Sequence, residues 1–288
     1  MVDKIFIPGS EWVYFKLYTG TKTADAILQN ELYRYVRELL NNGIIDKWFF
    51  IRYTDPDFHI RLRLHLKEIR NFTFVFNRFF EVFNPLINNG FVWDIQCNTY
   101  QREIDRYGSN SITFVEDLFF IDSEHIIPLL HRLDNENAEQ QRWRLALLLI
   151  DSFLSAFSFD VPQRKELLAF MADNSKKEFG FVHHNVTKQL NDKYRANRKE
   201  IANAMASENE ILNARRQSMV PVAEKLSGME KAGDLQVELK SLLTSLIHMT
   251  MNRWFRTKNR LHEMVIYEFL ARYYASEIAK TLQGVAKK

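Results

Sequence analysis

Residues 47–66 read KWFFIRYTDPDFHIRLRLHL, and they set the architecture of the first half of the chain. Aromatic and aliphatic residues fill 47–53, and residues 58–66 alternate between polar and aliphatic side chains with period two. Both runs predict β-strands. The intervening residues 54–57, Thr-Asp-Pro-Asp, have the composition of a turn. The segment is therefore expected to form a β-hairpin.

The second strand of this hairpin should have two different faces, because successive side chains of a strand point to opposite sides. One face carries the aliphatic residues Ile60, Leu62, Leu64 and Leu66, which are expected to pack on the core. The other carries His59, Arg61, Arg63 and His65. Paired guanidinium groups suit the recognition of carboxylate or phosphate. The alternative is the solvated face of an ordinary antiparallel strand.

The remaining pattern predicts an α+β fold. Further strands are expected at 11–18 and 91–102, and helices at 23–42, 67–87, 109–120, 124–133, 138–157, 161–179, 236–255 and 261–282. Ser123 is the expected N-cap of the helix at 124–133. Residues 185–214 predict a charged helical segment with breaks near Asn197 and Ala206. We therefore expect an N-terminal antiparallel sheet with hairpins, packed against a largely helical C-terminal half.

The 288 residues are expected to form a single domain, strand-rich over 9–108 and helix-rich over 109–288. The chain has 39 basic and 36 acidic residues, a balance that does not require a nucleic-acid partner. Cys97 is the only cysteine, which excludes intramolecular disulfides and multi-cysteine zinc sites. The single cysteine predicts a reducing cytoplasmic location, in agreement with the lack of a signal peptide before Gly9 and of an apolar run of transmembrane length.

Residues 100–108, YQREIDRYG, form a second charged cluster, with Arg102, Glu103, Asp105 and Arg106 close together before Gly108. A charged loop beside a strand end can hold an active-site arginine. It can equally be a surface network of salt bridges that contributes little to stability.

The helix expected at 236–255 carries a polar stripe that includes Ser245, His248 and Asn252, because residues three and four apart share a helix face. A histidine whose tautomer is fixed by such neighbours can transfer protons near neutral pH. The alternative is a histidine that is hydrogen-bonded in or near the core.

Four motifs occur together in a recognisable order: GSEWVYFKLY at 9–18, FIRYTDP followed by HIRLR at 50–63, EIDRYG at 103–108 and LIHMTMNR at 246–253. Together they resemble the C-terminal glutamate-elimination domain of class I lanthipeptide dehydratases of the LanB type, also called the thiopeptide-type bacteriocin biosynthesis domain. The resemblance spans about residues 9 to 256. Ser109 departs from it, since a second glycine is expected after Tyr107-Gly108.

The resemblance implies a lyase that expels glutamate from glutamylated Ser or Thr of a ribosomally made precursor peptide and leaves dehydroamino acids. It implies no cofactor and no metal. The residues carried over as catalytic are His248, Arg106, Arg63 and Arg61. The residues expected to bind substrate are His59, Arg52, Asn252, Arg253 and Ser245.

The resemblance also implies a stand-alone elimination domain of a split system, with a separate tRNA-dependent glutamylating protein as partner. Direct binding of nucleic acid or membrane is not expected, and a homodimer stays open. Two other functions stay open as well. The first is the formal [4+2] cycloaddition of thiopeptide pyridine synthases, which also resemble this domain. The second is a non-catalytic scaffold subunit that binds peptide or tRNA.

Overall fold

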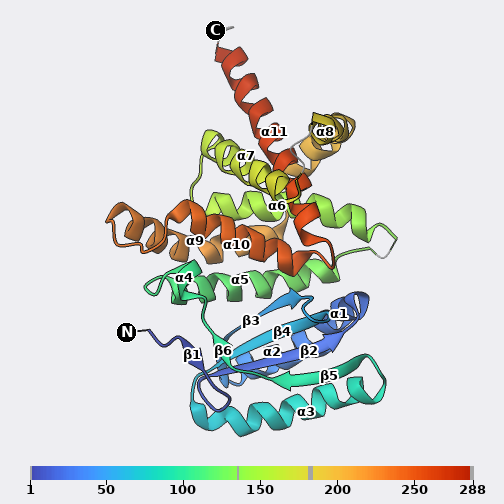
Figure 1. The fold of residues 1–288 in the computed structure, drawn as a ribbon, viewed down its shortest axis with the longest axis vertical. Coiled ribbons are helices and arrows are strands. Elements are labelled where there is room, and N and C mark those ends of the chain that lie inside the picture. Colours follow the sequence, from blue (N-terminus) through green and yellow to red (C-terminus); the bar gives the residue numbers. More distant parts are fainter. Residues whose placement is uncertain (1, 135, 181–183, 286–288) are drawn as a thin grey trace. The chain divides into compact units, whose positions relative to one another are not determined.

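The computed structural model describes residues 2–134, 136–180 and 184–285 (Figure 1). The chain packs as two compact units. The first comprises Met1–Arg132 and Lys225–Thr257, and the second comprises Leu133–Glu224 and Lys258–Lys288. The helical residues 109–132 and 225–257, expected in the helix-rich half, thus belong with the strands. A single elimination domain over the whole chain stays a prediction.

The first unit is built on a four-stranded antiparallel sheet with the order β3-β4-β2-β5. The predicted hairpin is confirmed as β3 (Ile45–Tyr53) and β4 (His59–Leu66). Beside β4 lies β2 (Trp12–Thr19), and β5 (Val92–Cys97) forms the far edge. The strand expected at 91–102 is interrupted. Its end, β6 (Tyr100–Gln101), leaves the sheet and pairs with β1 (Ile5–Phe6).

Helices on one side of the sheet are held by an aromatic core. The segment before the hairpin forms α1 (Thr21–Ile27), a π-helical turn (Leu28–Leu32) and α2 (Tyr33–Asn41), and α3 (Phe72–Asn88) follows the hairpin after a short 3₁₀ turn (Ile69–Asn71). Phe15 of β2 stacks on Phe79 of α3, with ring centroids 3.8 Å apart. Tyr35 of α2 meets the same Phe79 and Phe83 edge-on. These contacts bury one face of the sheet, and the other face carries the arginine residues of β4.

Two helices pack on the β3 edge of the sheet, α5 (Ile112–His131) and α10 (Leu239–Trp254). In Figure 1, α5 continues from the single turn of α4 (Ile104–Tyr107). The prediction of two separate helices at 109–120 and 124–133 is wrong, because α5 is one continuous helix. Ser123 is not a cap: its hydroxyl donates to the carbonyl of Phe119 (2.8 Å), as buried serines inside helices commonly do.

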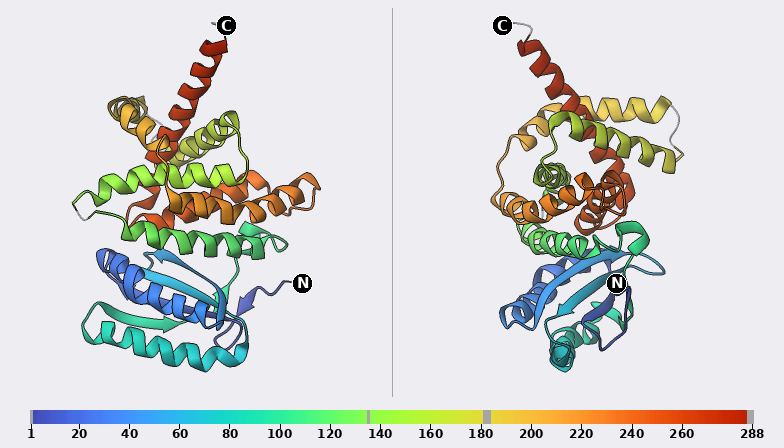
Figure 2. Two further views of the ribbon diagram at one scale, coloured as in Figure 1. Left: turned by 180° about the vertical axis from the view of Figure 1, so that it is seen from behind. Right: turned by 90° about the vertical axis from the view of Figure 1, so that its left-hand side faces the viewer.

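The second unit is helical and contains α6 (Ala138–Ala156), α7 (Val161–Glu178), α8 (His184–Met205) and α11 (Asn259–Val285). Within it, α7 and α11 pack against each other, as can be followed in Figure 2. The predicted break near Ala206 is confirmed, whereas the one near Asn197 is wrong, since α8 runs through that position. A further helix, α9 (Glu210–Lys231), contains the boundary between the units.

The α+β class with N-terminal antiparallel sheets and a mostly helical C-terminal half is confirmed. None of the described helices is long and apolar enough to cross a membrane.

Candidate active site

The alternation predicted for β4 is present. Its aliphatic residues are buried at 0–2% exposure and belong to the core. On the opposite face, His59 and Arg63 are buried, while Arg61 and His65 are partly exposed. Across the strand pair, Arg63 lies opposite Tyr14 and Arg61 opposite Lys16. Two like charges placed directly opposite each other repel, and such an arrangement favours an anion between or above them.

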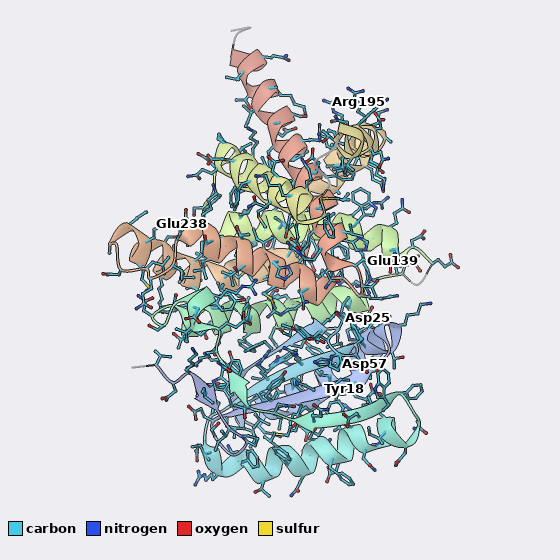
Figure 3. All side chains as sticks on the ribbon, viewed as in Figure 1. Tyr18, Asp25, Asp57, Glu139, Arg195 and Glu238 are labelled. Atoms are coloured by element: carbon cyan, nitrogen blue, oxygen red, sulfur yellow. The ribbon has the colours of Figure 1, made fainter. Side chains whose placement is uncertain are left out.

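Arg61 is positioned by His59. The Nδ1 of His59 is 2.8 Å from the backbone carbonyl of Asp57, so this nitrogen carries the proton. The unprotonated Nε2 accepts a hydrogen bond of 3.0 Å from the Nε of Arg61. The Arg61 guanidinium also lies 3.4 Å from the ring centre of Tyr53. Figure 3 labels Asp57 and Tyr18 at this end of the sheet, where Tyr18 packs on the His59 ring.

The neutral form of His59 is favoured by its surroundings. Desolvation by burial lowers the pKa of this histidine, and the charges of Arg61 and Lys16 lower it further, against the opposing hydrogen bond to Asp57. The pKa of Lys16 is also lowered, first by desolvation and then by Arg61 and Arg63. Burial is the main cause of both shifts, and the positive charges on this face of the sheet add to it.

Arg63 is enclosed by aromatic rings and has no counter-ion among the described residues. Its guanidinium carbon lies 4.5 Å from the ring centre of Tyr14, 4.8 Å from that of Tyr100 and 5.3 Å from that of Phe49. The side chain is 8% exposed, and its buried Nε has no hydrogen-bond partner within the described part of the chain. A buried charge without a partner is costly unless a ligand completes it.

Arg106 reaches the same region from α4. Its Nε donates to the Ser245 hydroxyl of α10 (3.2 Å), and its Nη1 is 3.4 Å from a carboxylate oxygen of Glu103. The turn after α4 needs a glycine, because Gly108 has φ +76° and a Cβ there would lie 2.6 Å from the Ser111 hydroxyl. Ser109, the departure from the expected motif, donates to the side chain of Gln236 from both its backbone nitrogen and its hydroxyl.

A cavity of about 450 Å³ joins Arg61, Arg63 and Arg106. Its other lining residues are Lys4, Tyr14, Thr99, Gln101, Arg102, Glu103 and Asp105. Arg102 is neutralised by Glu116 through two hydrogen bonds of 2.7 and 2.6 Å. Five of the lining residues are basic and two are acidic, so the cavity is suited to a small ligand with more negative than positive charge.

His248 does not belong to the described lining of this cavity. It lies on α10, partly exposed, three residues beyond the Ser245 that binds Arg106, and therefore on the same helix face. The structure thus brings three of the four expected catalytic residues together. The fourth is one helical turn from Ser245, which binds Arg106.

The other residues expected to bind substrate hold α10 to the sheet. Asn252 accepts from the backbone nitrogen of Arg52 (2.9 Å) and donates to its carbonyl (2.8 Å). The Arg52 side chain donates to Asp25, labelled in Figure 3, and to the carbonyl of Arg253. Arg253 is completely buried and donates to Asp122. Desolvation lowers the pKa of Arg253 to about 10.

The lining residues that were missed are Lys4, Tyr14, Thr99 and Gln101. For Tyr14, the alternation of the strand predicts that it shares a face with Trp12 and Lys16. Its position opposite Arg63 depends on the pairing of two strands that are far apart in the sequence, which alternation alone does not give.

Residues 12–274 match the family model described as lantibiotic biosynthesis dehydratase C-term. The subtilin biosynthesis protein SpaB of Bacillus subtilis is 22% identical over 99% of this chain, which spans 28% of the length of SpaB.

Two solved structures share the fold. The tRNA-dependent lantibiotic dehydratase MibB from Microbispora sp. 107891 is 19% identical, with a TM-score of 0.64 over 91% of this chain and 28% of MibB. The pyridine synthase TbtD from thiomuracin biosynthesis is 11% identical, with a TM-score of 0.68 over 93% of this chain and 98% of TbtD.

Proposed function

Because the chain belongs to the lantibiotic dehydratase C-terminal family, we propose that it is a lyase that β-eliminates glutamate from glutamylated Ser or Thr of a ribosomally made precursor peptide. The products are dehydroalanine or dehydrobutyrine and glutamate. The observation that carries this proposal is the shared cavity of Arg61, Arg63 and Arg106. In that cavity Arg63 is buried among aromatic rings and pairs with no carboxylate of the described residues.

The charges of the cavity match the leaving group. A glutamyl ester carries one carboxylate, and its expulsion creates a second. The guanidinium groups of Arg61 and Arg63 can hold these oxygens, together with Arg106 of α4 in the same lining. The acidic lining residues Glu103 and Asp105 can receive the ammonium group of the same glutamate. A ligand with two carboxylates and one ammonium fits a lining in which bases outnumber acids.

The reaction needs a proton transfer as well as anion binding. The Cα proton of the modified residue leaves to a base, its electron pair forms the Cα–Cβ double bond, and the Cβ–O bond breaks toward glutamate. His248 is the proposed proton-transfer residue, acting from the next turn of the helix whose Ser245 holds Arg106. The arginines stabilise the negative charge that develops on the departing carboxylate.

The proposed partners follow from the same chemistry. The substrate must arrive glutamylated, so a separate tRNA-dependent glutamylating protein is the proposed supplier. The precursor peptide is the common substrate of both proteins.

A second candidate is the formal [4+2] cycloaddition of a pyridine synthase. The observation that favours it is the fold of TbtD, which this chain matches over 98% of the TbtD length. That reaction starts from dehydroalanines and releases no glutamate from the substrate, so it offers no ligand for the arginine cavity.

The two candidates are separated by one assay with two substrates. The purified chain is incubated with a synthetic peptide that bears a glutamyl ester on serine, and in parallel with a peptide that already bears dehydroalanines. Mass spectrometry is expected to show loss of glutamate from the first peptide and no change in the second. If only the second peptide were converted, the proposed function would be cycloaddition and not elimination.

A further inference from the structure

Tyr14 lines the arginine cavity. It stands on β2 directly opposite Arg63 of β4, and the Arg63 guanidinium lies 4.5 Å from the centre of its ring. The side chain is 5% exposed, yet it belongs to the cavity lining. Its ring is therefore packed, and its remaining exposure is directed toward the space that a ligand would fill.

The Tyr14 hydroxyl has no hydrogen-bond partner among the described residues. Tyr100, the tyrosine on another side of Arg63, differs in this respect because its hydroxyl donates to Glu116 (2.9 Å). The Tyr14 oxygen is not one of the fully buried atoms that lack a partner, so it is accessible although the rest of the side chain is buried. Since Tyr14 lines the cavity, its hydroxyl is open to a ligand atom that accepts a hydrogen bond.

The hydroxyl is also in the state that can donate. Desolvation by burial raises the pKa of Tyr14, and this outweighs the lowering by Arg63 and Arg61. The phenol therefore keeps its proton at neutral pH, and it can donate to an anion without becoming charged itself. Its neighbours Arg61 and Arg63 already bind negative charge in the proposed reaction.

We propose that Tyr14 is a further catalytic residue, whose hydroxyl donates a hydrogen bond to the oxyanion that develops on the substrate during elimination. This inference rests on the proposed function. As the Cα proton leaves to the base, negative charge passes to the carbonyl oxygen of the same substrate residue. The electron pair then forms the Cα–Cβ double bond, the Cβ–O bond breaks, and glutamate departs as a carboxylate with the electrons of that bond. Tyr14 keeps its proton throughout, so the step needs no oxidant, reductant or cofactor.

The test is Tyr14→Phe, which keeps the ring against Arg63 and removes only the oxygen. With a glutamylated peptide as substrate, kcat is expected to fall about 100-fold, as for the loss of one oxyanion donor. KM and the Kd for L-glutamate should stay within about threefold, because the donor acts in the transition state. The matched control is Tyr33→Phe, which removes a half-buried hydroxyl of α2 outside the cavity lining and should leave kcat unchanged.

The outcomes separate this inference from the proposed function. If the wild type eliminates glutamate and Tyr14→Phe keeps kcat within twofold of it, the role of Tyr14 is overturned while the function stands. A parallel rise in KM and in the Kd for glutamate, without a fall in kcat, would also overturn it, because Tyr14 would then be a structural support of the binding site. A wild type that eliminates nothing would remove both proposals.

Discussion

The Nε of Arg61 donates a hydrogen bond of 3.0 Å to the Nε2 of His59, two residues away on the same face of β4. This geometry needs a neutral imidazole, because a protonated His59 would place two donors against each other. Arg61 is thus fixed on the cavity side of the sheet only while His59 is uncharged. The consequence is a pH dependence of both activity and stability.

We expect stability to begin to fall below about pH 6.5, the ordinary pKa of a histidine, and elimination to fall only at lower pH, where His59 takes up a proton in the folded protein. Since burial lowers the pKa of His59 in the folded protein, the unfolded chain binds the proton first. Stability is therefore full above that pH and declines as the pH falls toward the lower, folded-state pKa. The measurement is the melting temperature of wild type and His59→Gln from pH 5 to 8.

Glutamine can still accept from Arg61 and does not titrate, so the His59→Gln curve should decline less between pH 6.5 and 5. The control is His65→Gln, on the same face of β4 but bound to Asp46 outside the cavity lining. Parallel curves for wild type and His59→Gln would contradict the assigned role.

Replacement of Arg63 and of Arg102 should have different effects on the free energy of unfolding. Arg63→Met removes a buried charge that has no counter-ion among the described residues, so the free energy of unfolding should change by less than about 1 kcal/mol. Elimination should fall at least about 100-fold. Arg102→Met leaves the buried carboxylate of Glu116 without its arginine, and should lower the free energy of unfolding by about 3 kcal/mol. Urea denaturation measures both, and equal destabilisation would show that Arg63 is structural.

His248→Ala should stop the reaction after the substrate has bound. We expect glutamyl adducts to persist on the peptide, with a rate lowered by about 100-fold or more and an unchanged affinity for L-glutamate. Ser245→Ala is the matched comparison: it frees Arg106 on one side and should cost only about threefold to tenfold in rate. Mass spectrometry of timed samples follows both. Fully dehydrated peptide from His248→Ala would remove this residue from the mechanism.

Asn252 should be a determinant of stability and not of glutamate binding. Its side chain makes two hydrogen bonds to the backbone of Arg52, one as donor and one as acceptor. Asn252→Ala would leave both backbone groups without these partners, which costs about 1–3 kcal/mol of folding free energy. The melting temperature should fall while the Kd for L-glutamate stays within twofold. A tenfold weaker binding of L-glutamate at an unchanged melting temperature would show that Asn252 contributes to substrate binding.

The hairpin and its arginine row could be predicted because the pattern there is local. Alternation over residues 58–66 is enough to separate Leu62 from Arg61 and Arg63. The continuity of α5 could not be predicted in this way. Ser123 reads as a helix cap in isolation, and its bond to Phe119 becomes visible only once the helix is formed.

Long-range pairing accounts for the rest of the candidate site. The place of Tyr14 beside Arg63 depends on the register of β2 against β4, and the contact of Arg106 with Ser245 joins residues 139 positions apart. The substrate-binding role expected for Arg52 came from its place in the hairpin motif. Its side chain points to Asp25 and α10, on the face opposite the arginine row, and the substrate-binding role stays a prediction.

The most direct test of the arginine cavity is the binding of its proposed product, measured by isothermal titration calorimetry with L-glutamate and L-glutamine. Glutamine keeps the size and the ammonium of glutamate but lacks one carboxylate. We predict that the wild type binds glutamate at least about tenfold more tightly than glutamine, and that Arg63→Met abolishes this difference. Equal binding of the two amino acids by the wild type, or a preference that survives in Arg63→Met, would contradict the account.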